Sequence, residues 1–389
     1  MGGVIVWDEH RADVVIQRRP PWLPTAIPDR CYPAPLTDED IAWCGHWLQR
    51  EYRVAFKVDA LQTALTAVSH LREIHPLRDW LTTLTWDGTE RTEDWLCDYL
   101  GAANTELTRA YARRWLVAAV ARAFDPGCKA EDMLVLEGGQ GNGKSRALRV
   151  LATGDRRPAL AGVQAAWFTD EYIDVKAKDG KLTMAGAWIV EFSELVSITK
   201  ADVEPIKAFI SRQVDRYRFP WARRSMDVRR SCVFAGTTNS PQYLRDPTGG
   251  RRFWPVECGD TNIEGLRAAR EQLWAEAVAL YRGGARWYLE AGRDDDLIDA
   301  SAQLVDRRRD VDPWEALLAS WADDPRIIRA STRQVLDYLN IDEGKRTKAD
   351  EQRAANVLRA LGFTRHIQVR EGARRLWYWV KPDAGATEP

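Results

Sequence analysis

The chain has 389 residues, enough for roughly two to three domains of ordinary size, each with its own hydrophobic core. Its 56 Lys and Arg residues are balanced by 57 Asp and Glu residues, so the overall charge gives no argument for a nucleic-acid partner. Hydrophobic residues make up 45% and charged residues 29%, which is typical of a folded globular protein and excludes a disordered chain.

The cysteines and the apolar stretches of the sequence give no sign of a metal site, a disulfide framework or a membrane span. The six cysteines show no Cys-x-x-Cys spacing, so the sequence predicts neither a zinc site nor a disulfide framework. The most apolar stretch, 115–124, is interrupted by Arg122 and is far shorter than the ~20 residues of a membrane span. The N-terminus also lacks the pattern of a secretion signal. We therefore expect a cytoplasmic protein with no membrane partner.

The N-terminal third divides by composition. Residues 1–36 contain six prolines and little periodicity, which predicts an extended arm or linker. Apolar residues then recur at helical spacing, for example Leu61, Leu65 and Val68, so we expect a helical domain over 37–125.

A glycine-rich loop opens the next predicted domain, 126–290. An apolar strand at 133–136 precedes it and a helix follows from Ser145, the order that opens an α/β nucleotide-binding domain. The loop satisfies G-x-x-x-x-G-K-[ST] and predicts a site for ATP and Mg²⁺, in which Lys144 reaches the β and γ phosphates and Ser145 holds the metal. A glycine-rich surface turn is the alternative, but such a turn needs no Lys-Ser pair at its end. The predicted nucleotide-binding residues are Gly138, Gly139, Gln140, Gly141, Asn142, Gly143, Lys144 and Ser145.

Two carboxylates follow the next apolar strand, 187–190. Glu191 closes this run and Glu194 comes three residues later. One carboxylate can act on the Mg²⁺ shell, where Glu191 is our candidate metal ligand, and the other can orient or deprotonate the attacking water. Which residue has which role stays open, and a buried strand that ends in a solvated Glu is the simpler alternative.

Three further polar residues are candidates for the reaction. Asn239 follows a third apolar strand, 231–236, and can hydrogen-bond the γ-phosphate and the water, although Asn is also common in turns. Arg251 and Arg252 follow Gly249-Gly250, and an arginine supplied to a neighbouring γ-phosphate accelerates hydrolysis by ~10³ to 10⁵. A basic hairpin is the alternative for the arginine pair.

The order of these motifs resembles superfamily 3 helicases, an AAA+ branch found in phages, plasmids and viruses. More closely, Trp86-Asp87-Gly88, Ile206-Lys207-Ala208-Phe209, Gly236-Thr237-Thr238-Asn239 and Gly250-Arg251-Arg252-Phe253-Trp254-Pro255 resemble the virulence-associated E family of phage and pathogenicity-island replication proteins. The resemblance covers about residues 70–280.

This resemblance implies a ring, commonly hexameric, that hydrolyses ATP at subunit interfaces and translocates on single-stranded DNA. It implies that 37–125 is a collar, that Asn239 is a sensor and that Arg251 or Arg252 acts on the ATP of a neighbouring subunit. Superfamily 3 proteins often have adjacent acidic residues, whereas Phe192 and Ser193 separate the two glutamates here. Relatives often carry a primase upstream; a primase for this chain is expected on another polypeptide.

The first candidate DNA-binding segment is a basic block between Arg212 and Arg230, which contains seven Arg against two Asp and is interleaved with aromatic residues. Arginines can follow phosphates and aromatic rings can stack on bases. A basic face for subunit packing is the alternative. The predicted contacts are Arg216, Arg218, Trp221, Arg223 and Arg224.

The second is the tail. A polar linker is predicted at 291–313, followed by helices at 314–321, 332–339 and 348–361 and a hairpin over 365–370 and 374–380. This is the pattern of a winged-helix domain at 314–382, with a disordered tail at 383–389. Trp377 and Trp379 are expected to point into its core, and a protein-binding role is the alternative to DNA binding. The predicted DNA contacts are Arg353, Arg359, Arg370, Arg374 and Arg375.

Our leading hypothesis is therefore an ATP-dependent DNA helicase or translocase that acts in phage or mobile-element replication. A DNA-bound initiator or loader that uses ATP as a switch is the main alternative. A phosphotransferase and a nucleotide-dependent scaffold without a DNA role are further ones.

Overall fold

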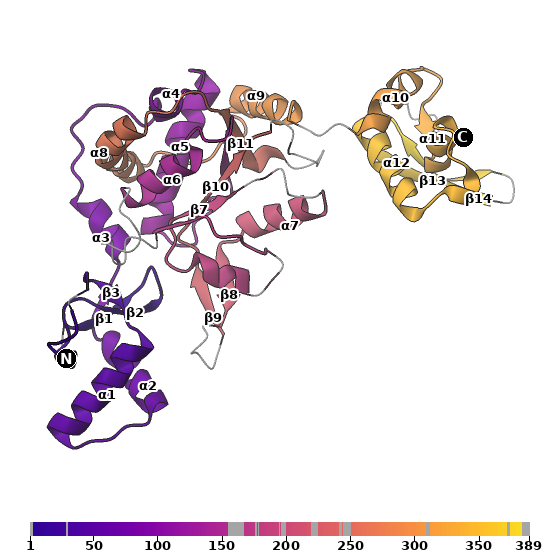
Figure 1. Ribbon diagram of the computed structural model, residues 1–389. Helices are drawn as coiled ribbons and strands as arrows, with labels where there is room; N and C mark the ends of the chain where they lie inside the picture. The colour runs from indigo at the N-terminus through magenta and orange to yellow at the C-terminus, as the bar shows by residue number, and fades with distance from the viewer. Residues whose placement is uncertain are drawn as a thin grey trace. The chain divides into compact units, whose positions relative to one another are not determined.

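The computed structural model describes most of the chain and forms two compact units, 1–308 and 309–389 (Figure 1). The described residues are 3–28, 30–154, 167–175, 177, 179–193, 195, 200–218, 225–240, 243, 250–308, 312–371 and 374–382.

The N-terminal segment is a small α/β layer and not the extended arm predicted for 1–36. Its strands form a four-stranded sheet in the order β3-β2-β1-β4, and Trp7, Trp22 and Ile16 are buried where the strands meet the first two helices. The strands were missed because runs of four residues are too short to show a period. The elements are β1 (Ile5–Asp8), β2 (Asp13–Ile16), β3 (Ala34–Pro35), β4 (Glu73–Ile74), α1 (Asp38–Tyr52) and α2 (Val58–Ser69).

The predicted helical domain at 37–125 is helical but is not separate. Whereas α1 and α2 cover the N-terminal sheet, the next three helices share a core with the central sheet. Trp115 on α5 donates its indole N–H to the carbonyl oxygen of Phe234, at 2.9 Å. The three helices are α3 (Pro76–Thr83), α4 (Trp95–Leu100) and α5 (Glu106–Phe124).

A five-stranded parallel sheet forms the centre of the first unit, in the order β11-β5-β10-β7-β6. Successive residues of β5 point to opposite faces and all are buried, as expected for a parallel sheet covered on both sides. Helices α4, α5, α6 and α8 cover one face and α7 covers the other (Figure 1). The predicted mixed α/β fold is confirmed at this level. The elements are β5 (Met133–Glu137), α6 (Lys144–Thr153), β6 (Phe168–Thr169), β7 (Ile189–Phe192), α7 (Lys200–Ile210), β10 (Val233–Thr238), β11 (Phe253–Glu257) and α8 (Ile263–Arg282).

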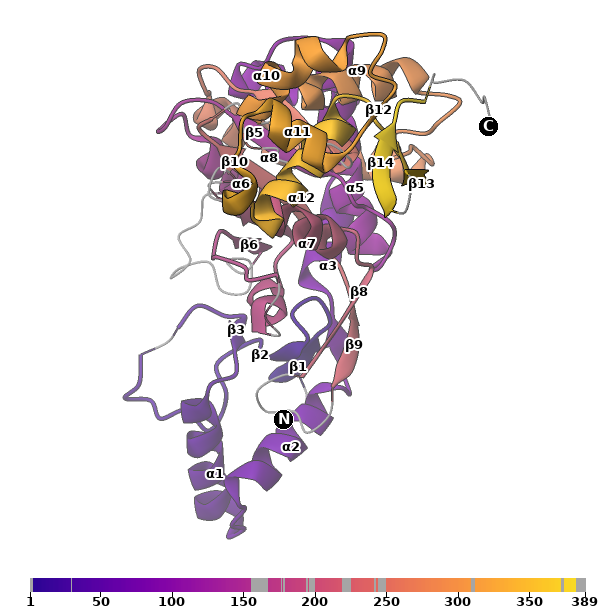
Figure 2. The same cartoon turned by 90° about the vertical axis from the view of Figure 1, so that its right-hand side faces the viewer.

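A two-stranded hairpin, β8 (Val214–Tyr217) and β9 (Met226–Arg229), comes between α7 and β10. Tyr217 and Val228 pack in the core of the N-terminal layer, so the hairpin lies against β1 and β2 (Figure 2). The basic block of the sequence is therefore folded onto the N-terminal layer along part of its length.

The predicted linker at 291–313 is wrong over most of its length. Residues Asp295–Asp306 form α9, which packs on β11 and α5 within the first unit. Carboxylates that make the segment polar take part in ion pairs within the first unit. Asp294 pairs with Arg114 at 2.8 Å, for example.

The second unit contains the three helices and the hairpin that the sequence predicts. Ser331 caps α11 and Thr347 caps α12, each through a reciprocal capping box. Trp377, expected in the core, is 53% exposed, whereas Tyr378 beside it is buried. The elements are α10 (Pro313–Ala322), β12 (Arg329–Ala330), α11 (Thr332–Tyr338), α12 (Lys348–Ala360), β13 (Arg365–Glu371) and β14 (Arg374–Val380), with sheet order β12-β14-β13.

Across the described residues of both units, none of the helices combines the length and the apolar character that crossing a membrane requires.

Candidate functional site

The glycine-rich loop joins the carboxyl end of β5 to the first residue of α6, where the sequence predicts it. Gly138 has φ 143° and Gly143 has φ 78°, both in the region that favours glycine. A Cβ atom on Gly138 would lie 2.8 Å from the carbonyl oxygen of Cys258, and one on Gly143 would lie 2.8 Å from Oγ1 of Thr261. The loop therefore depends on glycine at both ends, while Gly139, Gln140 and Gly141 between them are exposed.

The ammonium group of Lys144 lies inside this loop. It donates hydrogen bonds to the carbonyl oxygens of Gly138 and Gly139, each at 2.7 Å, and to Oδ1 of Asn239 at 3.4 Å. Burial lowers the pKa of Lys144, and the Coulombic effects of Cys258 and Glu191 oppose this shift. The structure thus brings together the predicted Lys and the predicted sensor Asn, which are 95 positions apart.

Glu191 on β7 is the acidic centre of the site. Its Oε1 accepts hydrogen bonds from the hydroxyls of Ser145 and Thr237, both at 2.6 Å, and the residue is only 1% exposed. Burial raises the pKa of this carboxyl group. Its Oε2 is buried and has no hydrogen-bond partner among the described residues. An unpartnered carboxylate oxygen beside a serine hydroxyl fits a hard divalent cation such as Mg²⁺.

Of the remaining predicted residues, Asn142 reaches the carbonyl oxygen of Gly259 at 3.5 Å. Glu194 lies outside the described residues. Thr237 was not predicted, although its position two residues before Asn239 at the same strand end is the signal that could have found it.

A buried network at the base of the loop was also missed. Glu137, the last residue of β5, accepts hydrogen bonds on Oε1 from the Tyr243 hydroxyl at 2.8 Å and from Nε of Arg308 at 2.5 Å. Burial and the neighbouring Glu137 raise the pKa of Tyr243 well above its usual value. An acidic residue at the end of a fully apolar strand was the available signal. This network ties the loop to the segment that follows Asn239 and to the end of α9.

The two predicted catalytic arginines lie elsewhere in the same chain. In the register of the sheet Phe253 pairs with Met133, so Arg252 is level with Asp132 at the amino end of β5. The glycine-rich loop begins six residues further along this strand, about 20 Å away at ~3.3 Å per residue. Nε of Arg252 is 3.5 Å from the carboxylate of Glu131, whereas Arg251 is exposed. The structure therefore does not bring either arginine to Lys144 of its own chain.

The predicted DNA contacts of the basic block are only partly described. Arg216 and Arg218 are exposed, and Arg216 lies 3.7 Å from Asp227 across the hairpin. Trp221, Arg223 and Arg224 lie outside the described residues. Arg230, which the charge count included, is instead buried in a double contact with Asp215.

Two of the predicted contacts of the tail have partners within the second unit. Arg353 donates two hydrogen bonds to Asp312, at 2.8 and 2.7 Å, and its guanidinium lies 4.0 Å from the ring centroid of Trp314. The guanidinium carbon of Arg359 lies 4.9 Å from the ring centroid of Trp379. Both arginines therefore pack within their own unit. In the backbone register Arg370 pairs with Arg375 and Glu371 with Arg374, and the side chains of these three arginines fall outside the described part.

Comparison with known proteins identifies the family. The profile of the virulence-associated protein E-like domain matches residues 81–305, more than half of the chain. The chain belongs to the virulence-associated protein E-like family. Its match includes the glycine-rich loop, Glu191, Asn239 and both arginines.

One solved structure supports the fold. The apo structure of the NrS-1 C-terminal region has a TM-score of 0.50 and 10% identity over 97% of this chain and 95% of that chain. Two A-form apo structures of the same region have TM-scores of 0.43 and 0.42, with 11% and 10% identity, over 77% of this chain and 78% of theirs. No curated protein matches the chain at a significant level.

Proposed function

We propose that this virulence-associated protein E-like chain is an ATP hydrolase that acts on DNA during replication of a phage or other mobile element. One observation carries the proposal. Lys144 and Ser145, Glu191, and Asn239 come from three separate segments and converge beside a glycine-rich loop at the carboxyl edge of a parallel sheet. Open α/β sheets bind their ligands at this edge.

The loop is the proposed phosphate-binding element. Its backbone N–H groups and the amino end of α6 favour an anion. In the described structure the ammonium of Lys144 bonds to the carbonyl oxygens of Gly138 and Gly139. Binding of ATP would exchange these carbonyl contacts for phosphate oxygens, so the ammonium group has hydrogen-bond partners in both states.

Ser145 and Glu191 are the proposed holders of Mg²⁺. When bound, the ion neutralises charge on the phosphates during transfer. Oε2 of Glu191, which is buried and has no hydrogen-bond partner within the described part of the chain, is available to the metal shell or to the attacking water. Glu194 stays the alternative general base. Asn239, which contacts Lys144, would orient the water or the γ-phosphate.

We further propose that Arg251 completes the site of a neighbouring subunit. It lies at the amino edge of the sheet, far from its own loop, and it is exposed, whereas Arg252 contacts Glu131. A ring of the superfamily 3 and AAA+ type, commonly hexameric, places such an edge against the next subunit's nucleotide. This arrangement makes hydrolysis depend on oligomerisation.

The proposed DNA partners are single-stranded DNA at the β8–β9 hairpin and duplex DNA at the second unit. Among the described residues of the basic block, the exposed Arg216 and Arg218 are the proposed contacts of single-stranded DNA. Three helices with an antiparallel hairpin are the arrangement of a winged helix, whose hairpin arginines would face the backbone. Arg353 and Arg359, whose guanidinium groups contact Asp312 and Trp379, are not included in this proposal. A separate primase is a further possible partner by family resemblance.

The first test is ATP hydrolysis by the purified chain with and without single-stranded DNA. Lys144→Ala should abolish turnover, and Lys57→Ala, which removes an exposed lysine far from the loop, should not. Wild-type turnover in Lys144→Ala would refute the site.

A tailed duplex then separates the two candidate functions. A motor unwinds it continuously while it hydrolyses ATP, whereas the initiator or loader switch hydrolyses slowly and leaves the strands paired.

A further inference from the structure

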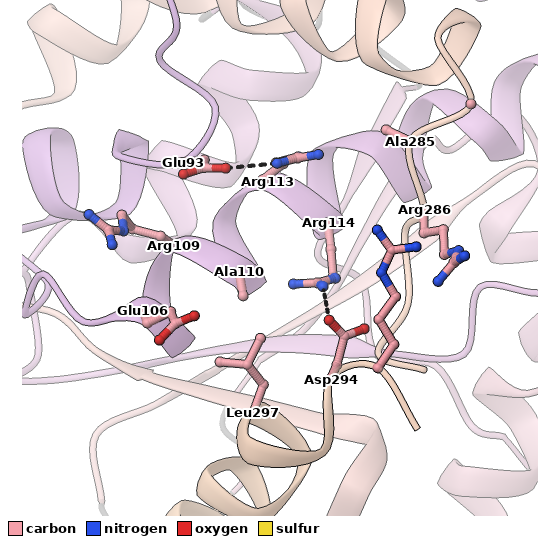
Figure 3. Close-up of a pocket in the computed structure, with 12 residues that line it drawn as sticks. Glu93, Glu106, Arg109, Ala110, Arg113, Arg114, Ala285, Arg286, Asp294 and Leu297 are labelled. Atoms are coloured by element: carbon pink, nitrogen blue, oxygen red, sulfur yellow. Dashed lines mark hydrogen bonds and ion pairs between the residues drawn. The ribbon is translucent and has the colours of Figure 1, made fainter. Parts of the chain in front are cut away.

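A second polar cavity lies in the first unit. It has a volume of about 480 Å³ and is formed by α5, the segment after α8 and the start of α9 (Figure 3). The glycine-rich loop contributes none of the residues that line it. These are Glu93, Glu106, Arg109, Ala110, Arg113, Arg114, Gly284, Ala285, Arg286, Arg293, Asp294 and Leu297.

Five arginines and three acidic residues line the cavity, and Glu290, which is not among the lining residues, pairs with Arg286, so a small excess of positive charge remains. Two more arginines are held in place by lining residues, Arg113 by Glu93 and Arg114 by Asp294, each at 2.8 Å. Figure 3 shows these two ion pairs on opposite sides of the cavity. Arg109 and Arg293 remain exposed at the cavity. The paired arginines thus form a fixed wall, and the exposed pair is available to an incoming ligand.

The lining indicates the chemistry of that ligand. The apolar side chains of the lining are those of Ala110, Ala285 and Leu297, and none of the lining residues is aromatic, so the lining offers no ring on which a base could stack. Guanidinium groups match the geometry of phosphate through paired N–H donors. The volume lies within the range of ordinary small-ligand sites, ~300 to 1,000 Å³.

We propose that this cavity binds phosphate groups without recognising a base. The phosphates are those of a single-stranded DNA backbone or of a free polyphosphate chain, which present the same chemistry. The cavity and the glycine-rich loop share no residues, so phosphate binding in the cavity does not depend on whether the loop binds nucleotide.

The test replaces Arg109 and Arg293 by Gln, singly and together, in the full chain carrying Lys144→Ala, which weakens phosphate binding at the glycine-rich loop. Arg282→Gln is the matched control, since it removes one exposed positive charge from the end of α8 outside the cavity. The probes are a labelled oligothymidylate, followed by anisotropy, and inorganic tripolyphosphate, followed by calorimetry. Thermal unfolding confirms that each variant folds.

The double variant should bind at least one of the two probes about tenfold more weakly than the control variant does. For the oligonucleotide, the slope of log K against log salt should fall by ~0.7 for each lost phosphate contact. Weakening of the oligonucleotide alone assigns the cavity to DNA, and weakening of tripolyphosphate alone assigns it to free phosphate chains. Weakening of both assigns it to phosphate of either source.

Unchanged binding of both probes overturns the proposal. A change in oligomer mass with unchanged binding also overturns it, and assigns the cavity to a contact between copies.

Discussion

The placement of Arg251 leads to a mixing experiment. The register of β11 with β5 puts this arginine about 20 Å from the loop of its own chain at ~3.3 Å per residue, far beyond the reach of one side chain. Arg251→Ala should therefore leave ATP binding unchanged and lower turnover by ~10³-fold or more, because the positive charge acts on a neighbour's γ-phosphate.

Mixing two inactive proteins tests this geometry directly. Lys144→Ala lacks a working loop but keeps Arg251, and Arg251→Ala has the opposite defect. In an equal mixture about one quarter of the interfaces in a closed ring combine an intact loop with an intact arginine. Steady-state hydrolysis should thus recover to about a quarter of the wild-type rate, whereas each protein alone stays inactive.

The same mixture made with Arg252→Ala is the control. Arg252 is partly buried and contacts Glu131, so its removal should change stability more than turnover. A mixture of Lys144→Ala and Arg251→Ala that is no more active than its components, despite confirmed subunit exchange, would refute action in trans.

Three further outcomes follow from buried polar groups. Glu191→Gln, which keeps the size of the side chain beside Ser145, should retain nucleotide binding and lose Mg²⁺-dependent turnover; equal turnover would exclude Glu191 from the reaction. Asp215→Asn should lower the free energy of unfolding by ~3 to 5 kcal/mol, because it leaves the Arg230 charge buried without its partner. The control is Asp227→Asn in the exposed pair with Arg216, which should lower the free energy of unfolding by less than ~1 kcal/mol in the same denaturant titration. Burial, aided by the Arg78 charge, lowers the pKa of His75 from 6.5 to about 4, so as pH falls from 6.5 to 4 the unfolded state takes up a proton that the folded state does not. Wild type should then lose ~1.4 kcal/mol per pH unit relative to His75→Asn, which retains an acceptor for the N-cap hydrogen bond; parallel stability curves would contradict this.

The parts of the fold that the sequence predicted well have strong local signals. The glycine-rich loop is fixed by its own residues, and the helices of the second unit begin at capping residues such as Ser331 and Thr347. The N-terminal strands carry no such signal, because each has only two to four residues. Their structure comes from packing against α1 and α2, which no local pattern reveals.

The candidate site shows the same division. Lys144 and Ser145 follow from one motif, but Glu137, Tyr243 and Arg308 meet across 106 and 171 positions of sequence. Such a network depends on which strands become neighbours. A buried acid at the end of an apolar strand indicates that a partner exists without identifying it.

The number of arginines in a stretch of this sequence does not predict the positive charge at the folded surface, either where the number is high or where it is low. Arg230 and Arg353 stand in basic stretches, yet their guanidinium groups lie against Asp215 and Asp312 and so contribute little to the surface field. Conversely, the arginines around the second cavity come from segments that also contain Glu93, Glu106 and Asp294, and no basic stretch marks them in the sequence. The field at a surface depends on which charges lie close in space and how far each is neutralised there. A DNA-binding surface in this family is therefore better sought from exposed, unneutralised arginines in the fold than from the density of arginine along the chain.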